Sequence, residues 1–138
     1  MTEHITYRDG YKYQLCEGYS VLTNLKPAAF IFTEFVRLDT DGTLSIADGY
    51  AWDGPSGPTI DTPDFMRGSL VHDALYQLMR EKHLDHATYR ELADKELKKI
   101  CLEDGMPGFR AEYVYQGVRA FGDPSADPAK SKPPITAP

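Results

Sequence analysis

The first half of the chain carries short strand-like apolar runs, which predict a small antiparallel β-sheet. Runs rich in aromatic and β-branched residues cover 11–16 and 18–23, and the strongest strand candidate covers 29–38. A turn at 39–42 follows, and apolar and polar residues then alternate over 43–46. Two strand-like runs joined by a short turn, with glycine supplying a positive φ angle, are typical of a β-hairpin.

The second half changes to the helical spacing of apolar residues, after a Gly/Pro-rich segment at 53–64 that predicts a loop. A first helix is expected from Pro63 to about Glu81, because Thr62 suits an N-cap and proline suits the first turn. A second helix starts at Asp85 and stops before Gly105, and a third covers about 109–121. The residues at helical spacing in the first helix are Val71, Leu75, Leu78 and Met79. Those in the second are Tyr89, Leu92, Ala93, Leu97, Ile100 and Cys101, and those in the third are Phe109, Tyr113, Gln116, Gly117 and Ala120.

These elements predict an α+β fold of one domain. The expected order over residues 1–121 is a small N-terminal antiparallel sheet, a Gly/Pro loop, two antiparallel helices and a third helix. The length of 138 residues is that of one ordinary domain. Residues 122–138 are polar and rich in proline, and such a segment buries too little apolar surface to offset the entropy of ordering. They are expected to form a flexible tail.

Composition narrows the classes of protein and partner. Hydrophobic residues make up 41% and charged residues 26%, which is ordinary for a globular domain. The longest apolar runs fall short of the roughly 20 residues of a membrane-spanning helix, and the N-terminus lacks the pattern of a signal peptide. We therefore expect no transmembrane segment and a location in the cytoplasm, or in a particle assembled there. The net charge of −6 disfavours nucleic acid as a partner, and the two cysteines are interpreted as buried thiols.

Polar residues on the predicted inner faces of the helices are the candidates for chemistry. His72 falls inside the apolar stripe of the first helix, Tyr76 lies one turn further on, and Asp73 lies on the flank. An imidazole on an apolar face needs a hydrogen-bond partner, because its lost solvation costs roughly 1 to 3 kcal/mol. Asp94, on the inner edge of the second helix, is the expected partner, since the short connection 81–85 favours antiparallel packing.

Two interpretations of this cluster remain open at this point. In the first, His72, Tyr76 and Asp94 form a buried polar network of structural value, and Asp73 is a solvent-facing acid. In the second, Asp94 orients His72, His72 activates a water molecule as a general base, and Asp73 binds a cation.

Ordered motifs in the second half resemble a protein family of tailed phages and prophages. The segments are GYAWDGPSGPTID (49–61), HDALY (72–76), RELAD (90–94) and YVYQGVRAFG (113–122). They are similar to the motifs G-[FY]-x-x-D-G-x-S-x-P, H-D-x-L-Y and R-x-x-A-D and to the closing segment of that family, which has no established activity. The resemblance implies a phage-encoded protein in the host cytoplasm or in the virion, with a phage-particle or host-protein partner.

A more distant resemblance, to secreted phospholipase A2 enzymes, suggests specific roles. Those enzymes have a Gly-rich calcium loop, an His-Asp-x-x-Tyr helix and an aspartate on an antiparallel helix. WDGPSGPTID, HDALY and ADKELKKIC follow the same order here. The resemblance implies that His72 is the general base, that Asp94 orients it, and that Tyr76 donates a hydrogen bond to Asp94. It also implies Ca²⁺ bound by oxygen ligands, which are the Asp73 carboxylate and loop carbonyls around Trp52, Gly54 and Ser56.

The two hypotheses for function follow from these observations. The first is a metal-assisted, Ca²⁺-dependent hydrolase of lipid esters that acts on phospholipid or another component of the host envelope. The second is a non-catalytic phage structural or host-interaction protein with a buried His/Asp/Tyr network. Phospholipase A2 enzymes are helical where this chain predicts a sheet, and they are exported and rich in disulfides. The two hypotheses differ in whether His72 faces an accessible pocket or is sealed by packing.

Overall fold

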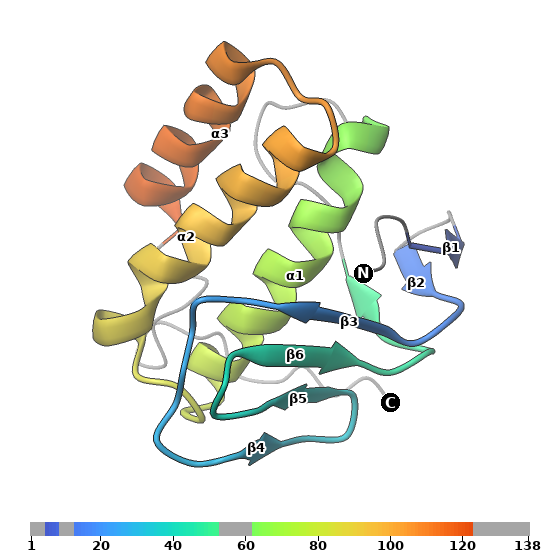
Figure 1. The fold of residues 1–138 in the computed structure, drawn as a ribbon, viewed down its shortest axis with the longest axis vertical. Helices are drawn as coiled ribbons and strands as arrows, with labels where there is room; N and C mark the ends of the chain where they lie inside the picture. Colours follow the sequence, from blue (N-terminus) through green and yellow to red (C-terminus); the bar gives the residue numbers. More distant parts are fainter. Residues whose placement is uncertain (1–4, 9–12, 53–61, 123–138) are drawn as a thin grey trace, which may run out of the picture.

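The chain forms two small antiparallel sheets followed by three helices, as a computed structural model shows for residues 5–8, 13–52 and 62–122 (Figure 1). This arrangement confirms the α+β fold class. The strands are β1 (Tyr7–Arg8), β2 (Tyr13–Leu15), β3 (Tyr19–Leu22), β4 (Ile31–Phe32), β5 (Val36–Leu38), β6 (Thr43–Ile46) and β7 (Ala51–Trp52), and the helices are α1 (Pro63–Arg80), α2 (His86–Glu103) and α3 (Gly108–Phe121).

The strands divide between a three-stranded sheet of order β1-β2-β7 and a four-stranded sheet of order β3-β6-β5-β4. The predicted hairpin is present as β5 and β6, with Leu38 opposite Leu44 and Val36 opposite Ile46. Gly42 in its turn has a φ angle of +97° and would bring a Cβ atom to 2.2 Å from the Thr23 carbonyl oxygen. Only glycine satisfies both conditions, so this turn depends on it.

The expectation of a single strand over 29–38 is wrong. That segment forms two short strands, β4 and β5, which pair antiparallel with Ile31 opposite Leu38. The Thr33 hydroxyl accepts a hydrogen bond from the Val36 amide at 3.0 Å and donates to the Val36 carbonyl at 2.9 Å. A threonine side chain that bonds nearby backbone groups competes with a continuous strand, and here it supports a tight turn.

The helices begin close to the predicted positions. Pro63 opens α1 after Thr62, whose side chain makes no capping hydrogen bond to the backbone and instead donates to the Asp64 carboxylate. Asp85 caps α2 by accepting a hydrogen bond from the Thr88 amide at 3.1 Å. Capping by aspartate satisfies an amide that has no partner within the helix, which explains why α2 starts there.

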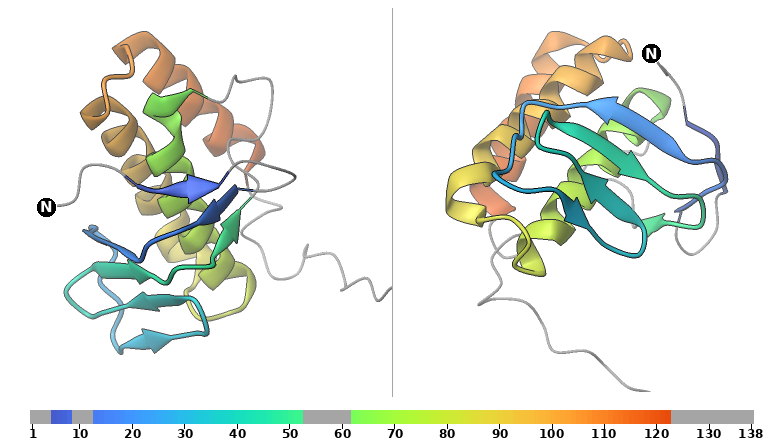
Figure 2. Two further views of the ribbon diagram at one scale, coloured as in Figure 1. Left: turned by 90° about the vertical axis from the view of Figure 1, so that its right-hand side faces the viewer. Right: turned by 60° about the horizontal axis from the view of Figure 1, so that its bottom comes forward.

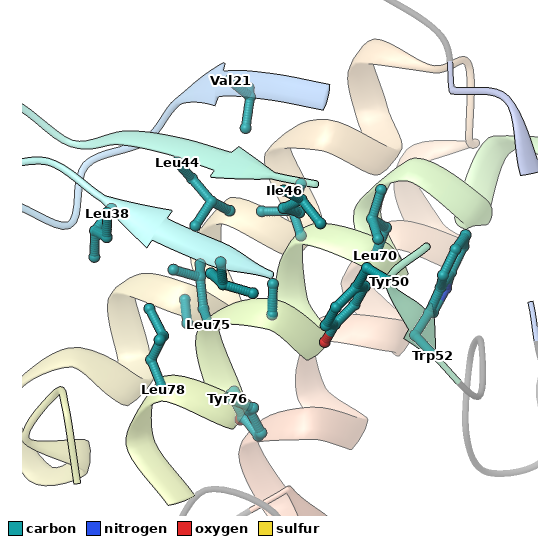
Figure 3. Close-up of a cluster of buried hydrophobic side chains, with 14 of the residues drawn as sticks. Val21, Leu38, Leu44, Ile46, Tyr50, Trp52, Leu70, Leu75, Tyr76 and Leu78 are labelled. Atoms are coloured by element: carbon teal, nitrogen blue, oxygen red, sulfur yellow. The ribbon is translucent and has the colours of Figure 1, made fainter. Parts of the chain in front are cut away.

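The main core lies between the four-stranded sheet and α1, and α2 covers another side of α1 (Figure 2). Figure 3 shows the facing side chains, which are Val21, Leu38, Leu44 and Ile46 from the sheet and Leu70, Leu75 and Leu78 from α1. Because neighbours surround it, α1 is buried over most of its length, including the predicted stripe and His72. The candidate residues on α1 are therefore held by a rigid, packed element.

The third helix presents a different face from the one its aromatic residues suggested. Phe109 and Tyr113 are 81% and 61% exposed, whereas Ala111 and Val114 are buried against α2 and Val118 is partly buried. The smaller side chains allow α3 to approach α2 closely, and the large aromatic rings remain outside. Spacing alone did not distinguish these two faces.

Several expectations fall on residues 1–4, 9–12, 53–61 and 123–138, which lie outside the described ranges. The flexible tail and most of the Gly/Pro loop belong to these segments, so both remain predictions. Within the described ranges, no helix has the length and apolar character needed to cross a membrane.

Candidate functional site

The structure brings His72, Tyr76 and Asp94 into contact, as the antiparallel arrangement of α1 and α2 predicted. His72 Nε2 lies 2.7 Å from Asp94 Oδ1, and the Tyr76 hydroxyl donates to the same oxygen at 2.5 Å. The two rings on α1 lie side by side, with centroids 4.0 Å apart. All three residues are buried, and Asp94 is completely so. A buried carboxylate between two donors is a satisfied arrangement rather than an isolated charge.

The contacts of Asp94 define its ionisation and the tautomer of His72. Burial raises the pKa of Asp94, but hydrogen bonds from His72, Tyr76 and Arg119 outweigh burial and hold the pKa below its usual range. Asp94 is therefore ionised at neutral pH and only accepts hydrogen bonds. Nε2 of His72 must then carry a proton and donate it, and in the neutral imidazole the lone pair lies on Nδ1.

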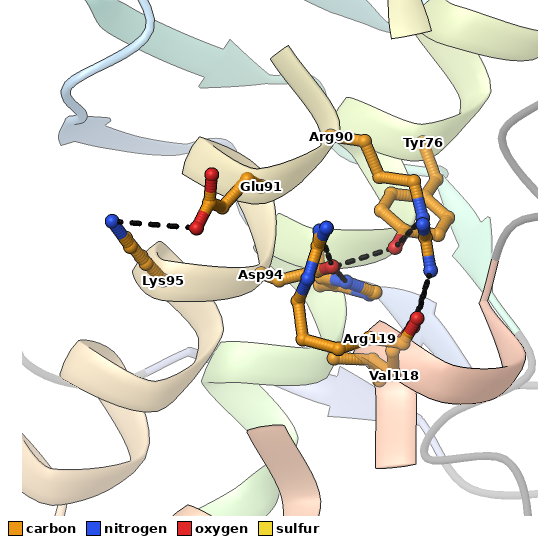
Figure 4. Close-up of polar contacts among 8 residues, drawn as sticks. Tyr76, Arg90, Glu91, Asp94, Lys95, Val118 and Arg119 are labelled. Carbon is orange, nitrogen blue, oxygen red and sulfur yellow. Dashed lines mark hydrogen bonds and ion pairs between the residues drawn. The ribbon is translucent and has the colours of Figure 1, made fainter. Parts of the chain in front are cut away.

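Two arginines complete the cluster, and neither was predicted from the sequence. Arg119 in the last turn of α3 donates from Nη1 to Asp94 Oδ2 at 2.8 Å. Arg90 on α2 donates from Nε to the Tyr76 hydroxyl at 3.2 Å. Figure 4 shows both arginines converging on Asp94 and Tyr76, whereas Lys95 and Glu91 extend away from them. The contact of Arg119 depends on how α3 docks, and no local pattern in the sequence encodes that docking.

Tyr76 acts as a permanent donor in this cluster. Burial raises its pKa, and the neighbouring Asp94 carboxylate raises it further, to well above the usual range for tyrosine. Gly122 approaches this ring closely, because a Cβ atom there would lie 2.8 Å from the Tyr76 hydroxyl and 2.6 Å from the Val118 carbonyl oxygen. The end of α3 therefore packs directly on the cluster, and the closeness requires glycine.

His72 retains a small contact with solvent. Its side chain is 10% exposed, and among the described residues its hydrogen bond is the one from Nε2 to Asp94. No buried side-chain nitrogen or oxygen of the described residues lacks a hydrogen-bond partner. Nδ1 therefore belongs to the part of the ring that solvent reaches. The imidazole therefore has a lone pair in contact with solvent, as a general base requires, although most of the ring is enclosed.

The predicted calcium ligands are only partly within the described ranges. Asp73 is half-buried beside His72 on α1, and Trp52 ends β7 with its indole N–H donating to Ser69 at 3.0 Å. Ser69 precedes Asp73 by one helical turn, so Trp52 contacts the side of α1 that carries Asp73. Gly54 and Ser56 lie outside the described residues.

The described donors do not make a calcium site by themselves. Ca²⁺ takes roughly six to eight oxygen ligands, whereas Asp73 supplies one carboxylate and Trp52 one carbonyl. No group of three or more His, Cys, Asp or Glu side chains in the described part of the chain could hold a metal ion. The calcium site therefore stays a prediction that depends on the loop at 53–61.

A second charge cluster, built around the buried Arg67, lies away from this site and joins the first strand of the four-stranded sheet to the helices. Arg67 on α1 donates to the Tyr19 hydroxyl at 2.8 Å, to Glu103 at 2.9 Å and to both carboxylate oxygens of Asp104. These partners are side chains of the strand β3 and of the end of α2. The planar fork of the guanidinium group suits such a set of acceptors, so we interpret this cluster as structural.

Comparisons of this chain with models of known protein families, with curated proteins and with solved structures gave no match. The function must therefore be argued from the geometry of the site and from the resemblances of its motifs.

Proposed function

We propose that this protein is a hydrolase of lipid esters in which His72 is the general base and Asp94 orients it. The observation that carries the proposal is the pair of hydrogen bonds at Asp94 Oδ1, from His72 Nε2 at 2.7 Å and from Tyr76 at 2.5 Å. These are the contacts that the resemblance to phospholipase A2 implied. They also leave the basic nitrogen, Nδ1, on the solvent side of the ring.

The proposed reaction gives the two nitrogens of His72 separate roles, with Nδ1 transferring the proton and Nε2 remaining bonded to Asp94. Nδ1 removes a proton from water while the water oxygen forms a bond to the ester carbonyl carbon, giving a tetrahedral oxyanion and an imidazolium. Asp94 stabilises this imidazolium through Nε2. The intermediate then collapses, the bond to the alcohol oxygen breaks, and Nδ1–H returns the proton to that oxygen. Arg119 forms an ion pair with the other oxygen of Asp94, so the carboxylate stays in place throughout these steps.

The first experiment measures hydrolysis of a fluorogenic phospholipid by the wild type, His72→Gln and His83→Gln, each with Ca²⁺ and with EDTA. Glutamine at position 72 retains an N–H donor toward Asp94 but lacks the basic nitrogen. His83 follows α1, and its side chain is well exposed, so it is the matched control. We expect His72→Gln to lose about 100-fold or more of the activity, the usual contribution of a general base, and His83→Gln to retain it. Equal rates for His72→Gln and the wild type, or an inactive wild type under both conditions, would contradict the proposal.

Calcium is a separate part of the proposal, and its test does not depend on turnover. Titration calorimetry with Ca²⁺ compares the wild type with Asp73→Asn. We expect weak binding, at roughly the millimolar end of the known range, and loss of that heat in the variant. Absence of heat from the wild type, or equal heat from both proteins, removes calcium from the mechanism.

A non-catalytic role is the second candidate, and one observation favours it. Asp94 on α2 accepts hydrogen bonds from α1, through His72 and Tyr76, and from α3, through Arg119. The same cluster could therefore serve to hold the three helices together in a phage structural or host-interaction protein. Under this candidate, His72→Gln changes stability but the wild type hydrolyses no ester. A role in the phage life cycle, in the virion or in the host cytoplasm, rests on the motif resemblance alone.

A further inference from the structure

Arg119 contacts both the buried carboxylate of Asp94 and the solvent. Its Nη1 donates to Asp94 Oδ2 at 2.8 Å, and the side chain is 32% exposed although Asp94 is completely buried. This is its only side-chain hydrogen bond to the described residues. A guanidinium group has five N–H donors in a planar fork, so most of the donors of Arg119 remain available on the outer edge of the group.

Arg90 fixes the backbone from which Arg119 extends. Its Nη2 donates to the carbonyl oxygens of Val118 at 2.7 Å and Arg119 at 2.8 Å (Figure 4). The Val118 carbonyl also accepts from the Gly122 amide at 2.9 Å, whereas carbonyls in the last turn of a helix generally lack such partners. The contact with Arg90 therefore ties the end of α3 to α2. Arg119 is thus held at its backbone by Arg90 and at its guanidinium by Asp94. A donor edge held in this way is preorganised for a ligand, because little side-chain entropy remains to be lost.

Arg119 and the candidate base bind the same carboxylate group. Asp94 bonds His72 through Oδ1 and Arg119 through Oδ2, so one carboxylate group separates the imidazole from the guanidinium. An oxyanion on the outer N–H groups of Arg119 would therefore sit close to the His72–Asp94 pair without displacing Asp94. Guanidinium groups bind phosphate and carboxylate through two parallel hydrogen bonds, which gives both affinity and orientation.

We propose that Arg119 is the residue that selects a phosphate-bearing ester, by binding its phosphate and holding the ester beside His72. The part concerning the ester rests on the proposed hydrolase function, whereas the phosphate site stands on the geometry of Arg119. The net charge of the chain is −6, and the negative charge of Glu91 interacts electrostatically with Arg119. Binding should therefore be weak and sensitive to ionic strength, because screening weakens both the attraction to Arg119 and the surrounding repulsion.

The binding experiment follows the side-chain Nε–H signal of Arg119 by NMR during titration with inorganic phosphate, glycerol 3-phosphate or acetate. Lys95→Gln is the matched control for Arg119→Gln, because it removes one positive charge from the residue after Asp94, where the side chain is exposed and pairs with Glu91. We expect both phosphate compounds to shift the Arg119 signal in the wild type and in Lys95→Gln. The ligand-induced shifts of neighbouring amides should be lost in Arg119→Gln. Arg119→Lys serves if Arg119→Gln does not fold, and should bind phosphate about tenfold more weakly, for want of one charge-assisted hydrogen bond.

The activity experiment uses dihexanoyl phosphatidylglycerol and dihexanoylglycerol, which have the same acyl chains with and without phosphate. We expect Arg119→Gln to raise KM for the phosphate-bearing ester about tenfold more than it raises KM for the neutral ester. If the wild type hydrolyses neither ester but phosphate still shifts Arg119, the hydrolase function fails and the phosphate site stands. A response to acetate equal to that to phosphate, phosphate binding that is equal in Arg119→Gln and Lys95→Gln, or an unmoved Arg119 signal, overturns the proposal.

Discussion

Replacement of Asp94 by asparagine tests the centre of the site most directly. The side chain is completely buried and accepts hydrogen bonds from His72, Tyr76 and Arg119. Hydrogen bonds to a charged partner contribute roughly 1.5 to 3 kcal/mol each. Arg119 is partly exposed and regains water when its partner is lost, so its share is smaller. We expect Asp94→Asn to lower the free energy of unfolding at pH 7 by about 3 to 5 kcal/mol, the range for removing one partner of a buried charge pair.

The same residue predicts how stability depends on pH. The pKa of Asp94 in the folded protein lies below its unfolded value of 3.8. The unfolded chain therefore binds the proton more tightly, and protonation favours unfolding. The stabilisation from Asp94 is fully present above about pH 4 and is lost as the pH falls through the folded-state pKa. Asp94→Asn should lack this part of the acid destabilisation.

Urea unfolding followed by tryptophan fluorescence measures both effects. The chain has one tryptophan, Trp52, which is buried and bonded to Ser69 on α1, so it reports unfolding of the main core. Lys95→Asn is the surface control. A loss of less than about 1 kcal/mol at pH 7, the value of one ordinary hydrogen bond, would refute the argument. Parallel pH profiles for the wild type and Asp94→Asn would refute it as well.

Three further predictions concern packing and reactivity. Gly117→Ala should stabilise α3 by about 0.5 to 1 kcal/mol through helix propensity, because its added Cβ meets no neighbouring atom within 4 Å. Gly122→Ala should destabilise the protein by about 1 to 3 kcal/mol through overpacking. Chemical denaturation measures both changes, and a stabilised Gly122→Ala would be the contrary result. Arg67→Met should lower the free energy of unfolding by roughly 1 to 3 kcal/mol, because the buried Tyr19 hydroxyl and the partly exposed Asp104 carboxylate lose their donor, and Arg67→Lys should restore only part of it. The same denaturation experiment checks this, and a fully stable Arg67→Met would contradict it. Burial raises the pKa of the Cys101 thiol to about 12, so at pH 8 iodoacetamide should label Cys101 only after the protein unfolds. The partly exposed Cys16 should be labelled in the native protein. Mass spectrometry distinguishes the two sites, and native labelling of Cys101 would contradict its burial.

The sequence determined the elements whose signals are local. Pro63 after Thr62 and the capping residue Asp85 marked the starts of two helices, and apolar spacing identified the buried faces of both. The short connection between these helices forces them antiparallel, so the contact between His72 and Asp94 followed from spacing alone. The spacing of apolar residues indicates which side of a helix faces inward, and here the inward sides of α1 and α2 pack against each other.

The tertiary structure decided what depends on docking between distant elements. Glu96 on α2 is buried, with Asn24 bonded to it at 3.3 Å, and no pattern distinguished it from the exposed acids around it. Arg119 reaches Asp94 only because small side chains on α3 pack against α2, leaving Phe109 exposed. The energy of such ion pairs depends on distance and burial, which arise when separate elements meet. The local sequence could therefore place His72 beside Asp94, but the contact of Arg119 with Asp94 required the folded chain.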